Sequence, residues 1–199
     1  MENKNFFCLL ASLLEQADKV ANVASVYGSF LKKIKKSAEK NIELKISEFT
    51  RNQNNNQVFN LDILELLDKV SGDILYLDPP YNHREYGANY HLLNTIALYD
   101  DFIPSGKTGL REYKKSLWCK KKYATVVFEE TIRKANFKYI FFSYNNEGII
   151  NSDDIKTICA KYGKYDLFTQ DYRRFKADNK RLQKANKTVE YLHFLEKNG

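Results

Sequence analysis

The chain has little cysteine and histidine, which limits the cross-links and metal sites that it can form. Its three cysteines, Cys8, Cys119 and Cys159, lie far apart, are odd in number and form no Cys-x-x-Cys pair. Such spacing excludes a disulfide framework and a zinc site, and it favours reduced thiols. The three histidines stand at no metal-ligand spacing from these cysteines. We therefore expect no bound metal.

Long apolar runs are also missing. No stretch approaches the roughly 20 apolar residues that a membrane-spanning helix requires, so we expect no membrane partner. The first residues, Met1-Glu2-Asn3-Lys4, do not resemble a secretory signal peptide. These features together predict a cytoplasmic protein.

Glycine is scarce as well. The chain has eight glycines, and no two of them are spaced Gly-x-Gly. The nearest pair, Gly106 and Gly109, lies in a stretch faintly similar to a phosphate-binding loop, but Asp101 occupies the position where that loop requires glycine. This sequence therefore contains no glycine-rich nucleotide-binding loop.

What remains is the composition of a basic globular protein. The 199 residues are 43% hydrophobic and 29% charged, which is enough for one domain with a core and a small helical appendage. The net charge of +7 and the pI near 9.1 favour a polyanionic partner such as DNA. A basic pI can also serve solubility alone, and charge by itself does not decide between the two.

The apolar pattern divides the chain into two parts. Residues 5–38 contain no proline and repeat apolar residues at helical spacing, with Asn22 and Gly28 as possible breaks between two helices. Residues 39–57 are polar and have the composition of an exposed loop. We therefore predict a helical segment with a polar linker at 1–57, followed by an α/β part at 58–199.

In the second part, short apolar runs alternate with helical patterns. This alternation predicts an α/β fold. We expect strands at 58–60, 74–77, 138–143, 165–169 and 189–195, and helices at 61–69 (capped by Asn60), 89–99, 124–135 and 152–162 (capped by Ser152).

The most informative stretch is the end of the run at 74–77, which is followed by Asp78, Pro79, Pro80 and Tyr81. The two prolines have no N–H for a sheet ladder, so the strand must stop there with a stiff exit. Asp78 and Tyr81 are then held at the carboxyl end of a buried strand, where ligands bind in open α/β sheets. A carboxylate and an aromatic ring at that place suit a planar base that carries an amino group. A rigid turn without function explains the tetrapeptide alone equally well.

The tetrapeptide resembles the catalytic motif of amino-group DNA methyltransferases, in particular the adenine-specific enzymes of restriction-modification systems. The resemblance extends over nearly the whole chain. Further similar stretches are residues 82–94 after the motif, 141–148 as the next strand and its loop, 172–178 with 188–192 as the carboxyl-terminal strand-loop-strand, and 6–38 as the helical stretch ahead of the catalytic strand.

The resemblance implies an α/β fold with a partial Rossmann-like methyltransferase sheet. That sheet would be mostly parallel, with an antiparallel carboxyl-terminal strand, and a helical segment would precede it. The implied reaction transfers a methyl group from S-adenosylmethionine to the amino group of an adenine flipped out of double-stranded DNA. Asp78 and the Pro79 carbonyl would hold that amino group, and Tyr81 would stack on the base.

The resemblance also implies contacts with the cofactor, from Asp78 and from Asp62. As an acid in the first turn of a helix, Asp62 has an equally good structural reason to be present. Enzymes of this family carry a Phe-x-Gly-x-Gly cofactor loop after their first strand, upstream of everything that matches here. The chain is thus expected to lack those first strands and to be inactive alone.

Without a first strand beside it, the catalytic strand would present an unpaired apolar edge, which is an aggregation hazard. Three outcomes fit this expectation. A separate amino-terminal polypeptide supplies the missing part, the helical segment folds over the gap, or the chain is a non-catalytic DNA-binding remnant or subunit. Methylation of RNA or of a protein amide is a further alternative, because related motifs act on other planar amino groups.

Candidate nucleic-acid contacts are basic residues mixed with aromatic ones, a combination that suits distorted or single-stranded nucleic acid. They fall in the loop after the motif, in the stretch 100–122 and in the basic loop 173–187. An ordinary solvated loop is the alternative for each of them. The residues are Arg84, Tyr86, Lys114, Lys115, Arg173, Arg174 and Lys176.

Overall fold

The chain forms two compact units in a computed structural model that describes residues 2–23, 26–29, 31–48, 53–173 and 187–198. The first unit consists of Met1–Asn56 and Tyr86–Lys114, and the second unit of Gln57–Glu85 and Lys115–Gly199. The chain therefore leaves the second unit after Glu85 and returns to it at Lys115. None of the described helices is long and apolar enough to cross a membrane.

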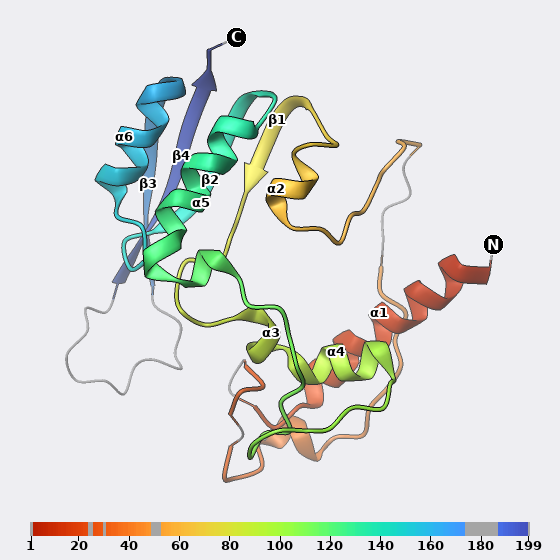
Figure 1. Ribbon diagram of the computed structural model, residues 1–199. Helices are drawn as coiled ribbons and strands as arrows, with labels where there is room; N and C mark the ends of the chain where they lie inside the picture. The colour runs from red at the N-terminus through yellow and green to blue at the C-terminus, as the bar shows by residue number, and fades with distance from the viewer. Residues whose placement is uncertain (1, 24–25, 30, 49–52, 174–186, 199) are drawn as a thin grey trace. The chain divides into compact units, whose positions relative to one another are not determined.

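The second unit is built on a four-stranded sheet with the order β1-β2-β4-β3 (Figure 1). The strands are β1 (Gly72–Leu77), β2 (Phe137–Asn145), β3 (Gly163–Arg173) and β4 (Lys187–Lys197). β1 is parallel to β2, whereas β4 is antiparallel to both β2 and β3. Three strands thus run in one direction and the carboxyl-terminal strand runs against them, which confirms the predicted α/β sheet.

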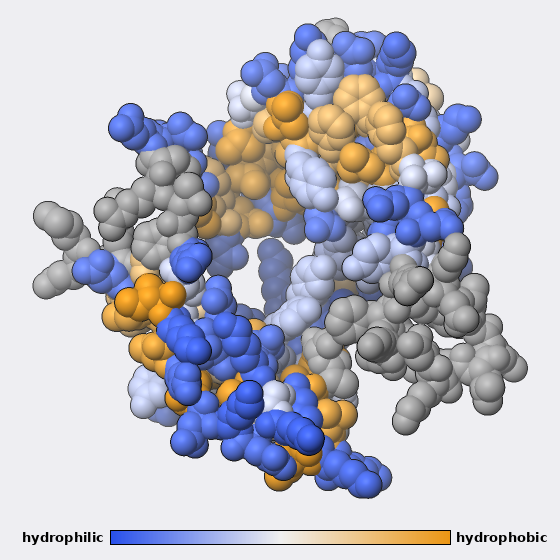
Figure 2. Space-filling model, turned by 180° about the vertical axis from the view of Figure 1, so that it is seen from behind, coloured by the Kyte–Doolittle hydropathy of each residue, from blue (hydrophilic) through white to orange (hydrophobic). Residues whose placement is uncertain are grey.

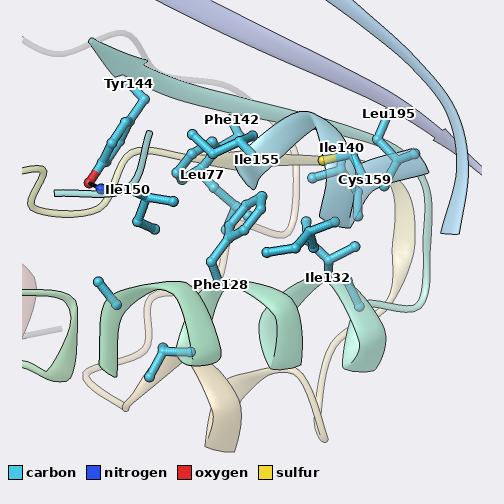
Figure 3. Close-up of a cluster of buried hydrophobic side chains, with 14 of the residues drawn as sticks. Leu77, Phe128, Ile132, Ile140, Phe142, Tyr144, Ile150, Ile155, Cys159 and Leu195 are labelled. Atoms are coloured by element: carbon cyan, nitrogen blue, oxygen red, sulfur yellow. Dashed lines mark hydrogen bonds between the residues drawn. The ribbon is translucent and has the colours of Figure 1, made fainter. Parts of the chain in front are cut away.

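One face of this sheet is covered by two helices, α5 (Lys121–Lys134) and α6 (Ser152–Tyr162). The buried residues of α5 recur at helical spacing, at Ala124, Val127, Phe128, Thr131 and Ile132, so one stripe of the helix faces the strands. Phe128 packs on Phe142 of β2 with ring centroids 4.6 Å apart (Figure 3). Full burial of each such ring contributes about 1.5–3 kcal/mol. This layer fixes β1 and β2 relative to each other.

The first turn of α6 corrects a prediction. Ser152 was expected to cap this helix, but Asn151 is the cap, because its side chain accepts a hydrogen bond from Asp154 N at 2.8 Å. Asp153 and Asp154 stand in the first turn, where the helix dipole favours negative charge. Ser152 is therefore the first helical residue.

The other face of the sheet carries apolar side chains that the described residues of the second unit leave exposed. Strand alternation directs Ile74 and Tyr76 of β1 to this side, and they are 61% and 60% exposed. Phe168 of β3 is 54% exposed. Figure 2, which shows the molecule from behind, has apolar side chains gathered over the sheet on this side. Exposed apolar area of this kind marks an interaction surface in soluble proteins.

The predicted strand at 58–60 does not form, and the helix after it is shorter than expected. Residues 58–60 are irregular, Val58 is 97% exposed, and β1 is the end strand of the sheet among the described residues. A strand requires a partner for its ladder, and the free edge of β1 does not pair with these residues. Helix α2 spans only Ile63–Leu66 and is capped by Asp62, not by Asn60.

The first unit is helical. It contains α1 (Glu2–Val20), η1 (Lys36–Glu39), α3 (Tyr86–Asn89) and α4 (His91–Leu98), and α1 packs against α4 and η1. The predicted break at Asn22 is confirmed, but no second α-helix follows before residue 38 among the described residues. The Asn22 side chain instead donates a hydrogen bond to Leu31 O at 3.0 Å and accepts one from Lys35 N at 3.1 Å.

Candidate active site at the carboxyl end of β1

The predicted catalytic residues lie where β1 ends. Leu77, the last residue of the strand, is 7% exposed and anchors it in the core, and Asp78 directly after it is exposed. Pro79 and Pro80 end the ladder with β2 and are half-buried. The motif therefore stands at the sheet edge where ligands bind in α/β proteins.

The end of the motif is held by the loop that follows β2. The backbone oxygen of Tyr81 accepts a hydrogen bond from Ile149 N at 2.8 Å and another from the Tyr144 hydroxyl at 3.3 Å. The Tyr144 hydroxyl also accepts from Ile150 N at 3.3 Å, and its ring meets the ring of Tyr81 edge to face at 6.4 Å. Burial raises the pKa of Tyr144, so its hydroxyl keeps its proton and remains a donor. These bonds position the Tyr81 ring.

Gly148 is part of the same arrangement. A Cβ atom at this position would collide with the ring of Tyr144. The aromatic ring that holds Tyr81 can thus occupy its place only because residue 148 has no side chain. Sequence reasoning did not assign this role to Tyr144, although Tyr144 and Gly148 both lie in the stretch 141–148.

A cavity of about 380 Å³ opens beside the motif in the second unit. It brings together the two carboxylates that were expected to contact a cofactor, Asp62 and Asp78. Asp62 also accepts a hydrogen bond from Leu64 N at 3.1 Å, so it caps α2, whereas the sequence predicted an acid inside the first turn. The other lining residues are mostly apolar or aromatic: Leu61, Ile63, Tyr76, Leu77, Pro79, Pro80, Ser116 and Trp118. Apolar and aromatic walls with two carboxylate acceptors suit a planar ligand that carries hydroxyl or amino groups.

The wall formed by Ser116 and Trp118 comes from residues more than thirty positions beyond the motif. Glu85 accepts a hydrogen bond from Ser116 N at 2.9 Å, and His83 Nδ1 lies 3.0 Å from Cys119 O. Burial, together with the nearby Glu85 carboxylate, raises the pKa of the Cys119 thiol to about 11, so this cysteine is an unreactive packing residue. The residues just after the motif thus fasten this wall in place.

Besides Asp78, the carboxylate of Glu190 lies at the same edge of the sheet, and sequence reasoning did not identify it. Glu190 of β4 is paired across the ladder with Asn145, the last residue of β2. Asn145 is 6% exposed and donates a side-chain hydrogen bond to Glu190. Desolvation and the charge of Asp78 raise the pKa of Glu190. No local pattern marks Glu190, because its position depends on the pairing of β2 with β4.

The predicted nucleic-acid contacts are distributed over both units. Arg84 and Lys115 are exposed in the second unit, and Tyr86 and Lys114 are exposed in the first. Arg173 is the last residue of β3, and its side chain lies outside the described part of the structure, as do Arg174 and Lys176. Their role in binding stays a prediction. In the described ranges, no three His, Cys, Asp or Glu side chains gather as a metal site requires.

Comparison with known proteins supplies independent findings. A family model described as D12 class N6 adenine-specific DNA methyltransferase matches residues 5–158. The chain is 57% identical over 199 residues to Type II methyltransferase M.NlaIII of Neisseria lactamica, covering 99% of this chain and 60% of that protein. It is 41% identical over 197 residues to Type II methyltransferase M.FokI of Planomicrobium okeanokoites, covering 96% of this chain and 30% of that protein.

A third relative has a similar extent. Type II methyltransferase M.CviAII of Paramecium bursaria Chlorella virus 1 is 38% identical over 187 residues, which cover 94% of this chain and 56% of that protein. This chain therefore spans less than two thirds of the length of each of these relatives. No solved structure matches it.

Proposed function

The chain belongs to the D12 class N6 adenine-specific DNA methyltransferase family, and on that premise we propose that it carries the catalytic edge of an enzyme that methylates adenine in double-stranded DNA. The observation that carries the proposal is the position of Asp78-Pro79-Pro80-Tyr81. The motif stands at the carboxyl end of β1, beside a cavity with a second carboxylate. Hydrogen bonds from Ile149 and Tyr144 to the Tyr81 backbone oxygen hold the end of the motif beside this cavity.

In this proposal the residues act by positioning. An adenine is flipped out of the duplex at a cost of a few kcal/mol, and stacking on the Tyr81 ring returns about 1–3 kcal/mol. The Asp78 carboxylate and the Pro79 carbonyl accept hydrogen bonds from the amino group. Both acceptors pull electron density toward the amino nitrogen and aim its lone pair at the methyl donor, which is catalysis by orientation.

S-adenosylmethionine supplies the electrophilic methyl group in such a reaction. The cavity beside the motif fits part of this cofactor, since its lining includes the acceptors Asp62 and Asp78 and the rings of Tyr76 and Trp118. What this chain does not offer is a Gly-x-Gly loop, which lets backbone approach a ligand closely. The proposed cofactor site is therefore only partly built by these residues.

We propose that a further polypeptide segment completes the site. Among the described residues β1 is the end strand of the sheet, so one of its edges has no neighbouring strand there, and the apolar side chains Ile74 and Tyr76 are exposed beside it. A strand added to this edge would pair with the backbone of β1, and a helix after it would cover the exposed apolar side chains. A separate amino-terminal chain that carries the cofactor loop has these properties.

The first test is cofactor binding. We expect the purified chain to bind S-adenosylmethionine weakly or not at all in calorimetric titration, because no glycine loop is present. Co-expression with the part of M.NlaIII that this chain does not cover should restore binding and methyl transfer to duplex DNA. Low-micromolar affinity of the chain alone would contradict the requirement for a further segment, and inactivity of a complex that binds cofactor would contradict the proposed reaction.

A non-catalytic DNA-binding subunit is the second candidate. Two observations favour it, the net charge of +7 and the missing glycine loop. The co-expression experiment also distinguishes the two candidates, because a subunit that only binds DNA gives no methylated adenine. Both candidates require contact with DNA, so DNA binding is a separate prediction.

We expect weak duplex binding at low salt that is largely lost at physiological salt. Each phosphate contact contributes a slope of about −0.9 to log affinity against log salt. Replacing Arg173, Arg174 and Lys176 together with glutamine should therefore flatten the slope by up to about three units. Filter binding or fluorescence anisotropy at several salt concentrations measures it.

The control variant removes the same charge elsewhere. Lys69, Lys156 and Lys164 are exposed in the second unit and are not among the predicted contacts. Their joint replacement with glutamine should leave the slope nearly unchanged. If both triple variants behave alike, or if binding does not depend on salt, the loop at 173–187 is an ordinary solvated connection.

A further inference from the structure

Three side chains at the catalytic edge come from three different strands. Asp78 follows β1, Asn145 ends β2, and Glu190 lies opposite Asn145 near the start of β4. Because side chains alternate along a strand, Asn145 lies on the same sheet face as Phe141, and Glu190 on the same face as Phe194. This is the face left open by α5 and α6. Asp78 is close enough for its charge to act on Glu190.

Hydrogen bonds between the start of β4 and the end of β2 fix the position of Glu190. Asn146 N donates to Val189 O and Val189 N donates to Asn146 Oδ1, both at 3.1 Å, so the start of β4 is tied to the end of β2. Asn145 Oδ1 accepts a hydrogen bond from Glu147 N at 3.0 Å, which leaves the amide hydrogens of Asn145 for the Glu190 carboxylate. A carboxylate held in this way keeps a defined place beside Asp78.

We infer that Glu190, oriented by Asn145, is the proton acceptor of the methyl transfer that Asp78 positions; this inference rests on the proposed function. As the new nitrogen–methyl bond forms from the lone pair, the sulfur–methyl bond breaks and its electron pair stays on sulfur. The amino nitrogen is then cationic and gives up one proton. That proton passes along the hydrogen bond to Asp78, is carried by solvent water to the Glu190 carboxylate and leaves from there to bulk water.

The electrostatic surroundings of Glu190 agree with this role. Desolvation raises its pKa and so does the Asp78 charge, whereas the Asn145 hydrogen bond acts in the opposite direction. Along β3 the residue that faces Glu190 is the uncharged Gln170, and α5 and α6 cover the opposite side of the sheet. The base that Glu190 forms is thus stronger than an ordinary glutamate, as a proton acceptor requires.

The first experiment measures the titration of Glu190 and does not depend on methyl transfer. In the purified full chain with ¹³C-labelled glutamate, NMR titration should show Glu190 titrating above the usual glutamate range, and Asp78→Asn should move that titration to lower pH. Asp62→Asn, which removes a carboxylate on the far side of the cavity, should leave it unchanged. A Glu190 titration that does not respond to Asp78→Asn overturns the inference.

The second experiment measures methyl transfer in the complex that contains the cofactor loop. Glu190→Gln should lower the rate by at least about tenfold without changing DNA affinity. It should also remove the fall in rate on acidification that titration of Glu190 causes in the unaltered protein. The matched control is Glu196→Gln, which changes a glutamate on the same strand and the same face at the opposite end of the sheet.

The outcomes separate this inference from the proposed function. If the unaltered complex methylates adenine and Glu190→Gln behaves like Glu196→Gln in rate and pH profile, the inference is wrong and the function stands. If the unaltered complex transfers no methyl group, the proposed function is wrong and the inferred role of Glu190 is overturned with it.

Discussion

Replacing Asp78 with alanine is expected to abolish methyl transfer by the completed enzyme while DNA affinity changes little. In the proposed mechanism the carboxylate acts on the amino nitrogen of the flipped base and makes no contact with phosphates. Most of the affinity of such proteins for DNA comes from basic side chains that contact the backbone. Loss of Asp78 therefore removes an interaction that matters in the transition state and not in the encounter with the duplex.

Single-turnover methylation and salt-matched DNA binding measure these two quantities separately. Asp73→Ala is the control, because Asp73 is an exposed acid on the same strand, β1, at its opposite end. Residual activity above about a tenth of the unaltered rate, a barrier change below roughly 1.4 kcal/mol, would exclude Asp78 as the activating group. An equal loss of activity in Asp73→Ala would point to general damage to the strand.

Acidification is expected to destabilise the second unit through His193. This residue of β4 is 1% exposed, and its burial lowers its pKa from 6.5 to about 4. The unfolded chain therefore binds a proton near pH 6.5 that the folded chain accepts only near pH 4, so stability falls as the pH drops through this window. The total loss is about 3 kcal/mol, of which about 2 kcal/mol occurs between pH 7 and pH 5.

The surroundings of His193 explain why it remains neutral. Its Nδ1 lies 2.8 Å from the Tyr165 hydroxyl, and its Nε2 is buried with no hydrogen-bond partner among the described residues. Rings of Phe142 and Tyr191 lie beside it, and they offer a charged imidazole no compensating acceptor. Protonation would thus place an uncompensated charge in the core.

Urea denaturation at pH 7 and pH 5 tests this expectation. The double variant His193→Leu/Tyr165→Phe removes both hydrogen-bonding groups together and should lose about 2 kcal/mol less stability on acidification than the unaltered chain. His83→Gln changes an exposed histidine and should keep the full loss. If the double variant retains the same acid sensitivity, other groups are responsible for it.

Local sequence determined strand β1 and the residue at which it ends. An apolar run of strand length followed by two prolines can continue neither the ladder nor a helix, so the exit at Asp78 is set by residues that are neighbours in the chain. The helix expected at 124–135 and the end of the first helix near Asn22 also depend on neighbouring residues, and the structure has α5 there and ends α1 at Val20. The expected strand direction along the sheet came from resemblance, and the pairing of β2, β3 and β4 confirms it.

Local pattern failed where a structure depends on a distant partner. Residues 58–60 have strand-like composition but no ladder to join, so they remain irregular. Asn60 was predicted as the cap of this helix, but the cap is Asp62, because its side chain accepts a hydrogen bond from the backbone N–H of Leu64. Likewise, no pattern indicated that residues 86–114 join the first unit.

The tertiary structure alone decided what surrounds Asp78. Trp118 reaches the cavity because Glu85 and His83 fasten the loop before α5, and Glu190 reaches the catalytic edge because β4 pairs with β2. These partners are tens to more than a hundred residues away along the chain. Composition and spacing describe contacts within a few residues, whereas these contacts form only when the strands pair and the helices cover one face of the sheet. The sequence thus determined which residue ends the strand, and the packing determined which side chains lie around it.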